Sequence, residues 1–314
     1  MCDIWKNNHN LTQLSEKDIE GLLVALKKLG TRQVLMSGGE ALLHPAFFKL
    51  CALLKNAGLH INLLSTGLLI KKYAADILAY VDEVIVSLDG DEATHDAIRN
   101  VPNAYRKLHE GILELKTQRP GYPISARCVI HKLNFRHWKQ IIETAKLNQL
   151  DHISFLPADI SSEAFNREVL WTDSRQNEIL ISKEELTELH QFIEEIIVEY
   201  ADDIASHFIA ESAAKLRNIY TYYSAAHGLV PYPYKKCNAP WVSAVVDPDG
   251  TVRPCFFHKP IGNIHEQSLP DILNGEKGFS FRKTLDMQLN ETCKKCVCSL
   301  NLSPGTDPVQ KTRA

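Results

Sequence analysis

The chain alternates between segments whose hydrophobic residues repeat with the period of a helix and short segments that are almost wholly apolar. Residues 15–29 gather their apolar side chains on one face, with Ser15 as the N-cap and Asp18 in the first turn, which predicts an amphipathic helix. Apolar runs of strand length follow at 33–37, 61–65, 83–88, 125–130 and 152–156. Helical segments separate these runs at 45–57, 71–81, 105–118 and 135–149. The pattern therefore predicts five β/α alternations.

These alternations predict an α/β fold. The strands are mostly apolar on both faces, which indicates parallel strands with helices outside, joined by right-handed crossovers. Polar residues stand where three of the strands end: Ser37-Gly38-Gly39-Glu40, Ser65-Thr66-Gly67 and Ser87-Leu88-Asp89. Parallel α/β folds bind their ligands at this edge, so we expect a site there.

The second half of the chain has a different character. Residues 162–180 indicate a polar, irregular insertion, and residues 302–314 a frayed tail. Residues 242–246 and 251–253 flank Asp247-Pro248-Asp249-Gly250, a strong turn signal, and predict a β-hairpin. The predicted division is a barrel-like domain at 1–182, a helical bridge at 183–230, a cysteine-rich domain at 231–301 and the tail at 302–314.

Composition and charge limit the class of protein, its partners and its cellular location. Hydrophobic residues make up 45% and charged residues 23% of the chain, as in an ordinary globular protein. A formal charge of −3 gives no reason to expect nucleic acid or an anionic membrane as a partner. No apolar run approaches the length of a membrane span, and the start of the chain is not a secretory signal. We therefore expect a cytoplasmic protein whose thiols stay reduced.

Five of the eight cysteines lie between residues 237 and 298. The hairpin would bring two of them together, and a short loop would add more, which suits a metal centre. These spacings alone permit either a structural Zn²⁺ site or an iron–sulfur cluster. The candidate ligands are Cys237, Cys255, Cys293, Cys296 and Cys298.

The strand ends offer further candidates. Glu40, after the glycine pair, could accept a hydrogen bond from a ligand ammonium group, or could simply be a solvated turn residue. Ser65, Ser87 and Asp89 suit ribose hydroxyls. Arg127 falls in the middle of a strand, where a buried guanidinium needs an anion. The alternative for Arg127 is a salt bridge to Glu40 or Asp89.

The remaining cysteines and histidines carry less signal. Cys51 and Cys128 have apolar neighbours and are expected in the core. Four loop histidines show no spacing typical of metal ligands: His44, His95, His131 and His258.

Taken in series, these motifs resemble a known family. Cys2-Asp3-Ile4-Trp5, the Gly-Gly-Glu and Ser-Leu-Asp-Gly motifs, and the C-terminal Cys-x₁₂-Gly-x₄-Cys hairpin resemble radical S-adenosylmethionine enzymes with a SPASM or twitch extension. The resemblance implies a partial (β/α)₆ barrel, here lacking its first strand. It also implies a catalytic [4Fe–4S] cluster, one auxiliary [4Fe–4S] cluster and S-adenosylmethionine as cofactors.

The resemblance also assigns residues by position. Cys2 corresponds to the third ligand of the catalytic cluster, and the residue before it, Met1, to one whose backbone meets the cofactor. Gly38, Gly39 and Glu40 correspond to the segment at the methionine amino group. Ser65, Ser87 and Asp89 fall near the ribose, and Arg127 faces the methionine carboxylate. Cys237, Cys255, Cys293 and Cys296 correspond to auxiliary-cluster ligands, with Cys298 as an alternative.

Two departures from the family pattern qualify this assignment. The first strand and the first two cluster cysteines have no counterpart before Met1, so we expect Met1 to be an internal methionine of a longer protein. As written, the chain supplies one of the three thiolates that the catalytic cluster needs. The C-terminal series is also shorter than a full SPASM set, which favours a single auxiliary cluster.

The function that the resemblance implies is reductive cleavage of S-adenosylmethionine to a 5′-deoxyadenosyl radical, which takes a hydrogen atom from a substrate. The substrate would be a peptide or a small metabolite, and the electron would come from a reductant such as flavodoxin or ferredoxin. The insertion at 162–180 and several tyrosines could line the substrate mouth, although packing between the domains is the simpler role. The alternative function is a non-catalytic binding protein with a degenerate barrel and a structural zinc site.

Overall fold

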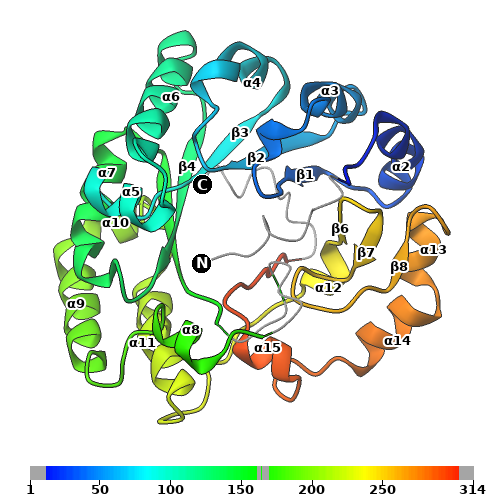
Figure 1. The fold of residues 1–314 in the computed structure, drawn as a ribbon. Helices are drawn as coiled ribbons and strands as arrows, with labels where there is room; N and C mark the ends of the chain where they lie inside the picture. The colour runs from blue at the N-terminus through cyan, green and yellow to red at the C-terminus, as the bar shows by residue number, and fades with distance from the viewer. Residues whose placement is uncertain (1–11, 161–163, 165–169, 304–314) are drawn as a thin grey trace.

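A curved parallel sheet with helices outside it forms the larger part of the molecule (Figure 1). The structure, a computed structural model, describes residues 12–160, 164 and 170–303. The strands follow one another in sequence order, β1-β2-β3-β4-β5, and all pair in parallel. They are β1 (Gln33–Met36), β2 (His60–Ser65), β3 (Glu83–Ser87), β4 (Ile124–Ile130) and β5 (His152–Pro157). This confirms the predicted α/β fold and the five strands.

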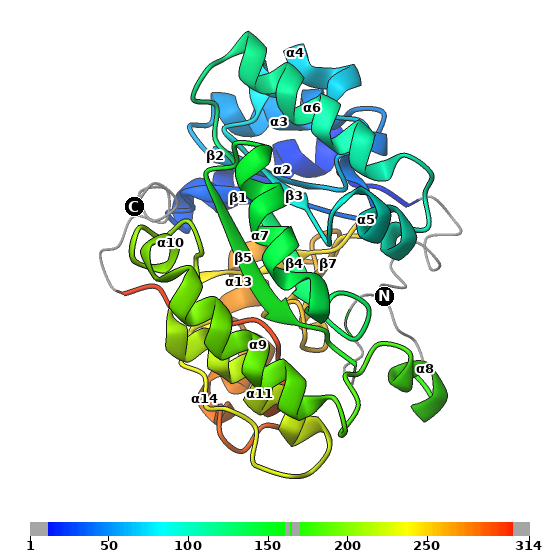
Figure 2. The same ribbon diagram turned by 90° about the vertical axis from the view of Figure 1, so that its left-hand side faces the viewer.

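Helices cover the outer face of the sheet (Figures 1 and 2). The first of them begins where the sequence predicts, because Ser15 and Asp18 cap each other in a capping box. The helices of this part are α2 (Glu16–Lys28), η1 (Ala41–Leu43), α3 (Phe47–Asn56), η2 (Lys71–Tyr73), α4 (Ala74–Tyr80), α5 (Glu92–Arg99), α6 (Ala104–Gln118), η3 (Phe135–His137) and α7 (Trp138–Leu147). The pattern missed α5, a short helix that Asp91 caps.

The two faces of the sheet differ more than the apolar runs suggest. On β4, Ala126 and Cys128 are buried on the helix side, whereas Arg127 between them is exposed on the inner side. Ser87, Arg127 and Ser154 are direct partners across β3, β4 and β5, and so form one polar row on the inner face. The prediction that Arg127 is buried is therefore wrong, because the inner face of this open sheet is not filled by apolar side chains.

The amino end of the sheet is closed by buried polar side chains. Glu83 accepts hydrogen bonds from Asn62 Nδ2 at 3.0 Å and from Ser125 Oγ at 3.2 Å. All three residues are at most 3% exposed. Burying a carboxylate is costly unless donors surround it, so these donors are what permits Glu83 on the inner face.

A helical segment continues from the last strand. It comprises α8 (Asp173–Asn177), α9 (Leu186–Glu199), α10 (Ala201–Ala205) and α11 (Ala213–Ala226). Between α10 and α11 the chain returns to the edge of β5, where Ile209 forms a parallel bridge with Ile153. The next backbone N–H on β5, that of Phe155, donates to Glu211 Oε2 at 2.8 Å. The carboxylate therefore takes the place of the next carbonyl in the ladder.

The last part of the chain is a small module that faces the inner side of the sheet (Figure 1). It holds an antiparallel sheet of β6 (Val245–Val246), β7 (Thr251–Arg253) and β8 (Gly262–Asn263). Its helices are α12 (Ala239–Val242), α13 (Leu269–Asn274), α14 (Glu276–Thr284) and α15 (Glu291–Lys295). The hairpin is confirmed, but its first strand is shorter than predicted, because Val242 is the last residue of the helical turn Ala239–Val242, which has Pro240 near its start.

Other sequence predictions fall partly outside the described residues. Met1, Cys2 and most of the tail lie there, as does a smaller part of the predicted insertion at 162–180, whose described part contains the helix α8. The domain boundaries at 182, 230 and 301 stay predictions. Among the described residues, no helix has the length and hydrophobicity to cross a membrane.

Glu211, at the edge of β5, is expected to make the free energy of unfolding depend on pH. Burial raises the pKa of Glu211 to about 7, against the opposing effects of the Phe155 N–H, Lys215 and Arg127. The folded state therefore keeps a proton that the unfolded chain releases above about pH 4.5. Because the folded state binds more protons across this window, its free energy of unfolding falls as the pH rises from about 4.5 to 7.

Glu211→Gln should remove this slope, because the amide oxygen still accepts from Phe155 but does not titrate. Glu211 is partly exposed, so solvent screens the effect and we expect a change below about 3 kcal/mol. Urea unfolding at a series of pH values measures it, with the exposed Glu20→Gln as the control. Parallel pH profiles for the wild type and Glu211→Gln would contradict the assignment.

Candidate iron–sulfur and nucleoside sites

The carboxyl ends of β1 and β2 are tied together by Glu40. Its carboxylate accepts from Ser65 Oγ at 3.0 Å and from the Thr66 N–H at 2.8 Å, and also from the Thr66 hydroxyl. Oε1 accepts in addition from the Leu42 N–H at 3.3 Å, which starts η1. The structure thus brings Glu40 and Ser65 together as predicted, but the carboxylate points to protein donors. Glu40 is a positioning residue for both strand ends.

The glycine pair before Glu40 is exposed. Gly38 and Gly39 follow β1 in a bend, and a Cβ added to Gly38 would have no neighbour within 4 Å among the described residues. Packing within the described part of the protein therefore does not require glycine at position 38. The open space beside its backbone is what a ligand would need in order to approach the peptide groups.

Two of the predicted ribose residues lie in different surroundings. Ser87 is half-buried on the inner face next to Arg127, so the structure brings these two candidates together. Asp89 is only 1% exposed, and its Oδ2 lies 2.6 Å from Arg99 Nε, close enough for an ion pair although not aligned for a hydrogen bond. Its backbone N–H donates to His95 Nδ1 at 3.2 Å. Asp89 therefore fixes the turn into α5.

Arg127 does not form the salt bridge considered as its alternative. Among the described residues, Asp89 is paired with Arg99, and the Glu40 carboxylate is taken by hydroxyl and amide donors. The guanidinium instead lowers the pKa of Glu211 and of the Cys298 thiol, although burial raises both overall. Arg127 is thus a cation between the inner face of the sheet and the cysteine module.

The C-terminal cysteines surround one cavity. Its volume is about 450 Å³, and its wall includes Cys237, Cys255, Cys293, Cys296 and Cys298. The sequence candidates are thus all brought together, and Cys298 is as much a part of the wall as the other four. In the described part of the chain, no three His, Cys, Asp or Glu side chains converge closely enough to hold a single metal ion.

Local structure explains how distant segments reach this cavity. Gly250 has φ of +82° in the hairpin turn, and a Cβ there would lie 2.9 Å from Asn263 Oδ1, so only glycine fits. This turn reverses the direction of the chain between Cys237 and Cys255, which both line the cavity. Asn238 then holds the far end of the series, because its side chain donates to the Leu302 carbonyl at 2.7 Å and accepts from the Leu302 N–H at 3.0 Å.

Burial raises the pKa of Cys255, Cys293, Cys296 and Cys298, so these four thiols are poor acids on their own. It raises the pKa of Cys293 to about 11, with the charges of Cys255 and Cys237 acting in the same direction. Burial and the neighbouring Cys298 likewise raise the pKa of Cys296 far above its usual range. Thiolates are the ligands that iron binds, so a metal's positive charge is needed to hold these sulfurs deprotonated together.

Several donors already point at the sulfurs. The backbone N–H groups of Phe257 and His258 lower the pKa of Cys255, although burial raises it overall. His258 Nε2 lies 3.3 Å from Cys293 Sγ, and the Cys298 N–H donates to Cys296 Sγ at 3.4 Å. Such N–H groups stabilise iron-bound thiolates. With sulfurs around a cavity rather than a point, the residues fit a multi-iron cluster better than one zinc ion.

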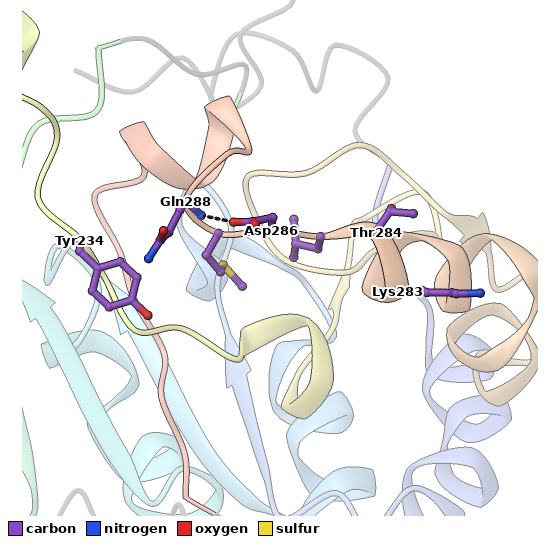
Figure 3. A pocket seen from close by; sticks show the side chains of 7 residues that line it. Tyr234, Lys283, Thr284, Asp286 and Gln288 are labelled. Carbon is purple, nitrogen blue, oxygen red and sulfur yellow. Dashed lines mark hydrogen bonds between the residues drawn. The ribbon is translucent and has the colours of Figure 1, made fainter.

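A second hollow adjoins the cysteine cavity (Figure 3). It measures about 540 Å³, and Tyr234, Met287 and Gln288 line both spaces. Asp286 Oδ1 accepts from the Gln288 N–H at 2.7 Å, which fixes the turn that carries the shared residues. Tyr234 is 66% exposed at this rim, so it remains a candidate for the substrate mouth.

Of the other tyrosines, some pack between parts of the molecule and one lines a cavity. Tyr222 and Tyr223 are at most 1% exposed, and Tyr223 donates to the Ile130 carbonyl and accepts from the Ala158 N–H. These two pack the helical segment against the sheet. Tyr232 lines the cysteine cavity.

Sequence reasoning missed two residues at the cysteine cavity. His258 was set aside because it shows no ligand spacing, and Lys235 was not considered. Lys235 lines the cavity, donates to the Cys296 carbonyl and lies 5.6 Å from the centre of the Tyr222 ring. The only signal for either was its place two or three residues from a predicted ligand.

Two family models match this chain. One, described as the radical SAM superfamily, matches residues 1–145, and the other, the SPASM iron–sulfur cluster-binding domain, matches residues 237–297. Radical SAM domains bind S-adenosylmethionine and a [4Fe–4S] cluster, and SPASM domains bind auxiliary iron–sulfur clusters. The second match covers the five cysteines except Cys298.

Individual proteins of known name or structure also resemble this chain. A PqqA peptide cyclase from Ruegeria pomeroyi is 25% identical over 282 residues, covering 85% of this chain and 67% of that protein. An Fe-coproporphyrin III synthase from Methanosarcina barkeri is 25% identical over 320 residues, covering 95% and 77%. The solved structure of native anSMEcpe with bound AdoMet shares the fold with a TM-score of 0.62, at 18% identity over 90% of this chain and 78% of that one.

The parallel sheet and its polar carboxyl edge thus lie mostly in the part of the chain that matches the radical SAM superfamily, residues 1–145, and the cavity of five cysteines lies largely in the part that matches the SPASM iron–sulfur cluster-binding domain, residues 237–297.

Proposed function

We propose that the protein is a radical SAM enzyme that acts on a peptide. The observation that carries the reaction class is the presence, in one chain, of an open Gly-Gly backbone at the strand ends and a cavity of five cysteines. When bound, the catalytic cluster supplies one electron that splits S-adenosylmethionine into methionine and a 5′-deoxyadenosyl radical, which takes a hydrogen atom from a substrate C–H group.

The strand ends would hold S-adenosylmethionine. Gly38 and Gly39 leave backbone groups open to the methionine amino group, while Glu40 keeps β1 and β2 in register by binding Ser65 and Thr66. Arg127, exposed on the inner face, would pair with the methionine carboxylate. Ser87 beside it could bind a ribose hydroxyl.

The other assignments from the sequence remain part of the proposal with less support. Asp89 would act near the ribose only indirectly, because its carboxylate is buried against Arg99. Met1 and Cys2 would belong to the catalytic cluster site. The module would hold one auxiliary cluster through Cys237, Cys255, Cys293 and Cys296 or Cys298.

A peptide substrate is supported by the relative named as a PqqA peptide cyclase. The relative named as a coproporphyrin synthase points to a small metabolite as the competing class. We further propose a cytoplasmic setting, in which the thiols stay reduced, and flavodoxin or ferredoxin as the electron donor.

The reaction class is tested with the full-length gene product purified without air and reconstituted with iron and sulfide. S-adenosylmethionine and dithionite should yield 5′-deoxyadenosine, measured by chromatography, even without a substrate. Iron, sulfide and a visible thiolate-to-iron band are expected in the same sample. Zinc alone, with no 5′-deoxyadenosine, would favour the non-catalytic zinc-binding alternative.

A second experiment compares a peptide with a small metabolite as the substrate. Synthetic peptides encoded next to the gene, and coproporphyrin III with and without iron, are added to the same assay. A peptide should raise 5′-deoxyadenosine formation and gain a new mass. Acceleration by the porphyrin alone would replace the peptide with the small-metabolite class.

Gly38→Ala probes the proposed S-adenosylmethionine site. A methyl group there meets no atom within 4 Å in the part of the chain that the structure describes, so the melting temperature should not change. It would occupy the approach to the backbone, and we expect the dissociation constant for S-adenosylmethionine to rise about tenfold, a loss of ~1.4 kcal/mol. Calorimetric titration measures this, and Gly21→Ala, which also has open space around it, is the matched control. Equal affinities in both variants would remove Gly38 from the site.

Cys255→Ala probes the module. We expect it to lose the iron of one cluster and to destabilise residues from about 231 onward, because cluster binding and folding are coupled. Iron and sulfide analysis with limited proteolysis provides the measurement. Cys51→Ala, a buried core thiol remote from the cavity, should keep its iron. Full iron content in Cys255→Ala would contradict ligation by Cys255.

A further inference from the structure

His258 directs a ring nitrogen and Lys235 an ammonium group toward the cysteine cavity. His258 reaches it from the loop after the hairpin, 35 residues before the cysteine that it contacts. Its Nε2 lies 3.3 Å from Cys293 Sγ, and the residue itself is only 9% exposed. Lys235 reaches the cavity from the segment before Cys237 and donates to the Cys296 carbonyl.

The histidine ring is held in place from two sides. It packs edge-on against the Phe281 ring, with the ring centres 4.8 Å apart, and Arg253 Nη1 donates to the His258 carbonyl at 3.2 Å. A sulfur bound to iron has no proton to give and can only accept. When the module holds its cluster, the contact between Nε2 and Sγ is therefore an N–H···S hydrogen bond from His258 to Cys293.

Lys235 differs from the other lysines at this cavity. Lys294 and Lys295 also line it, but their ammonium groups lie 2.8 Å and 3.7 Å from the carboxylate of Glu291, on the outer surface. The described part of the chain shows no carboxylate paired with Lys235, whose neighbours are the Cys296 carbonyl and the Tyr222 ring. Its charge therefore acts on the cavity itself.

We propose that His258 and Lys235 raise the reduction potential of the iron–sulfur cluster that the module cysteines hold, so that this cluster accepts an electron readily. Reduction adds one electron to the cluster, with no bond made or broken, and increases its negative charge. An N–H donor at a ligand sulfur and a nearby ammonium group both stabilise the more negative form. This inference rests on the cluster-binding part of the proposed function.

The test is a redox titration of the reconstituted full-length protein, followed by electron paramagnetic resonance. The signal that disappears in Cys255→Ala identifies the module cluster. His258→Phe keeps an aromatic ring against Phe281 but removes the N–H, and Lys235→Met keeps the chain length but removes the charge. Lys294→Met is the matched control, because it removes a cation that Glu291 already pairs.

We expect His258→Phe and Lys235→Met each to lower the reduced-to-oxidised ratio at a fixed potential about tenfold, which equals ~59 mV for a one-electron couple. Lys294→Met should titrate like the wild type. Midpoints unchanged in both variants, with full iron, would overturn the inference. Loss of the cluster in His258→Phe would also overturn it, because His258 would then be a ligand rather than a positioning residue.

The titration uses dithionite and mediators and needs neither S-adenosylmethionine nor a substrate. Its outcome is therefore separate from the test of the reaction class. A wild-type protein without iron in the module would instead refute the proposed cluster binding on which this inference depends.

Discussion

The cost of removing neighbouring thiolates from water, added to their mutual repulsion, is the constraint on which the C-terminal module is built. Five half-buried cysteines share one cavity, and burial with mutual repulsion raises the pKa of Cys293 and Cys296 well above that of a free thiol. The protein offsets part of this cost with backbone N–H groups at Cys255 and a lysine at the cavity wall. These donors are too few to stabilise four thiolates. The remaining positive charge has to come from iron, which is why folding of this module and cluster binding are expected to be one process.

At the carboxyl edge of the sheet, polar groups at the strand ends need hydrogen-bond partners. Two strands that end in polar residues would leave hydroxyl and amide groups unpaired, and Glu40 satisfies those of Ser65 and Thr66 with one carboxylate. Because the carboxylate is used inside the protein, the neighbouring glycine pair is what faces the open side. The backbone before Glu40, rather than the Glu40 side chain, is therefore the surface that this turn offers to a ligand.

The fold was largely predictable, whereas the contacts of individual side chains were not. Apolar runs bounded by helical segments favour parallel pairing, so the parallel pairing of β1 to β5 was predictable from the pattern. Asp89 was predicted as a ribose ligand from its place after β3, but the missed helix α5 brings Arg99 to its carboxylate. The contact between His258 and Cys293 joins residues 35 apart and depends on how the hairpin packs against α15, which no local pattern encodes.

The charge of Arg127 acts both on the inner face of the sheet and on the cysteine module. Arg127 stands in the polar row with Ser87 and Ser154, and its charge also reaches Cys298 in the module. The sequence predicted a buried guanidinium paired with a carboxylate, because a lone arginine in an apolar strand is costly. The inner face is open instead, so the cation keeps its solvent contact and is not neutralised by Glu40 or Asp89. A ligand anion that pairs with Arg127 would reduce the field that this guanidinium exerts on Cys298.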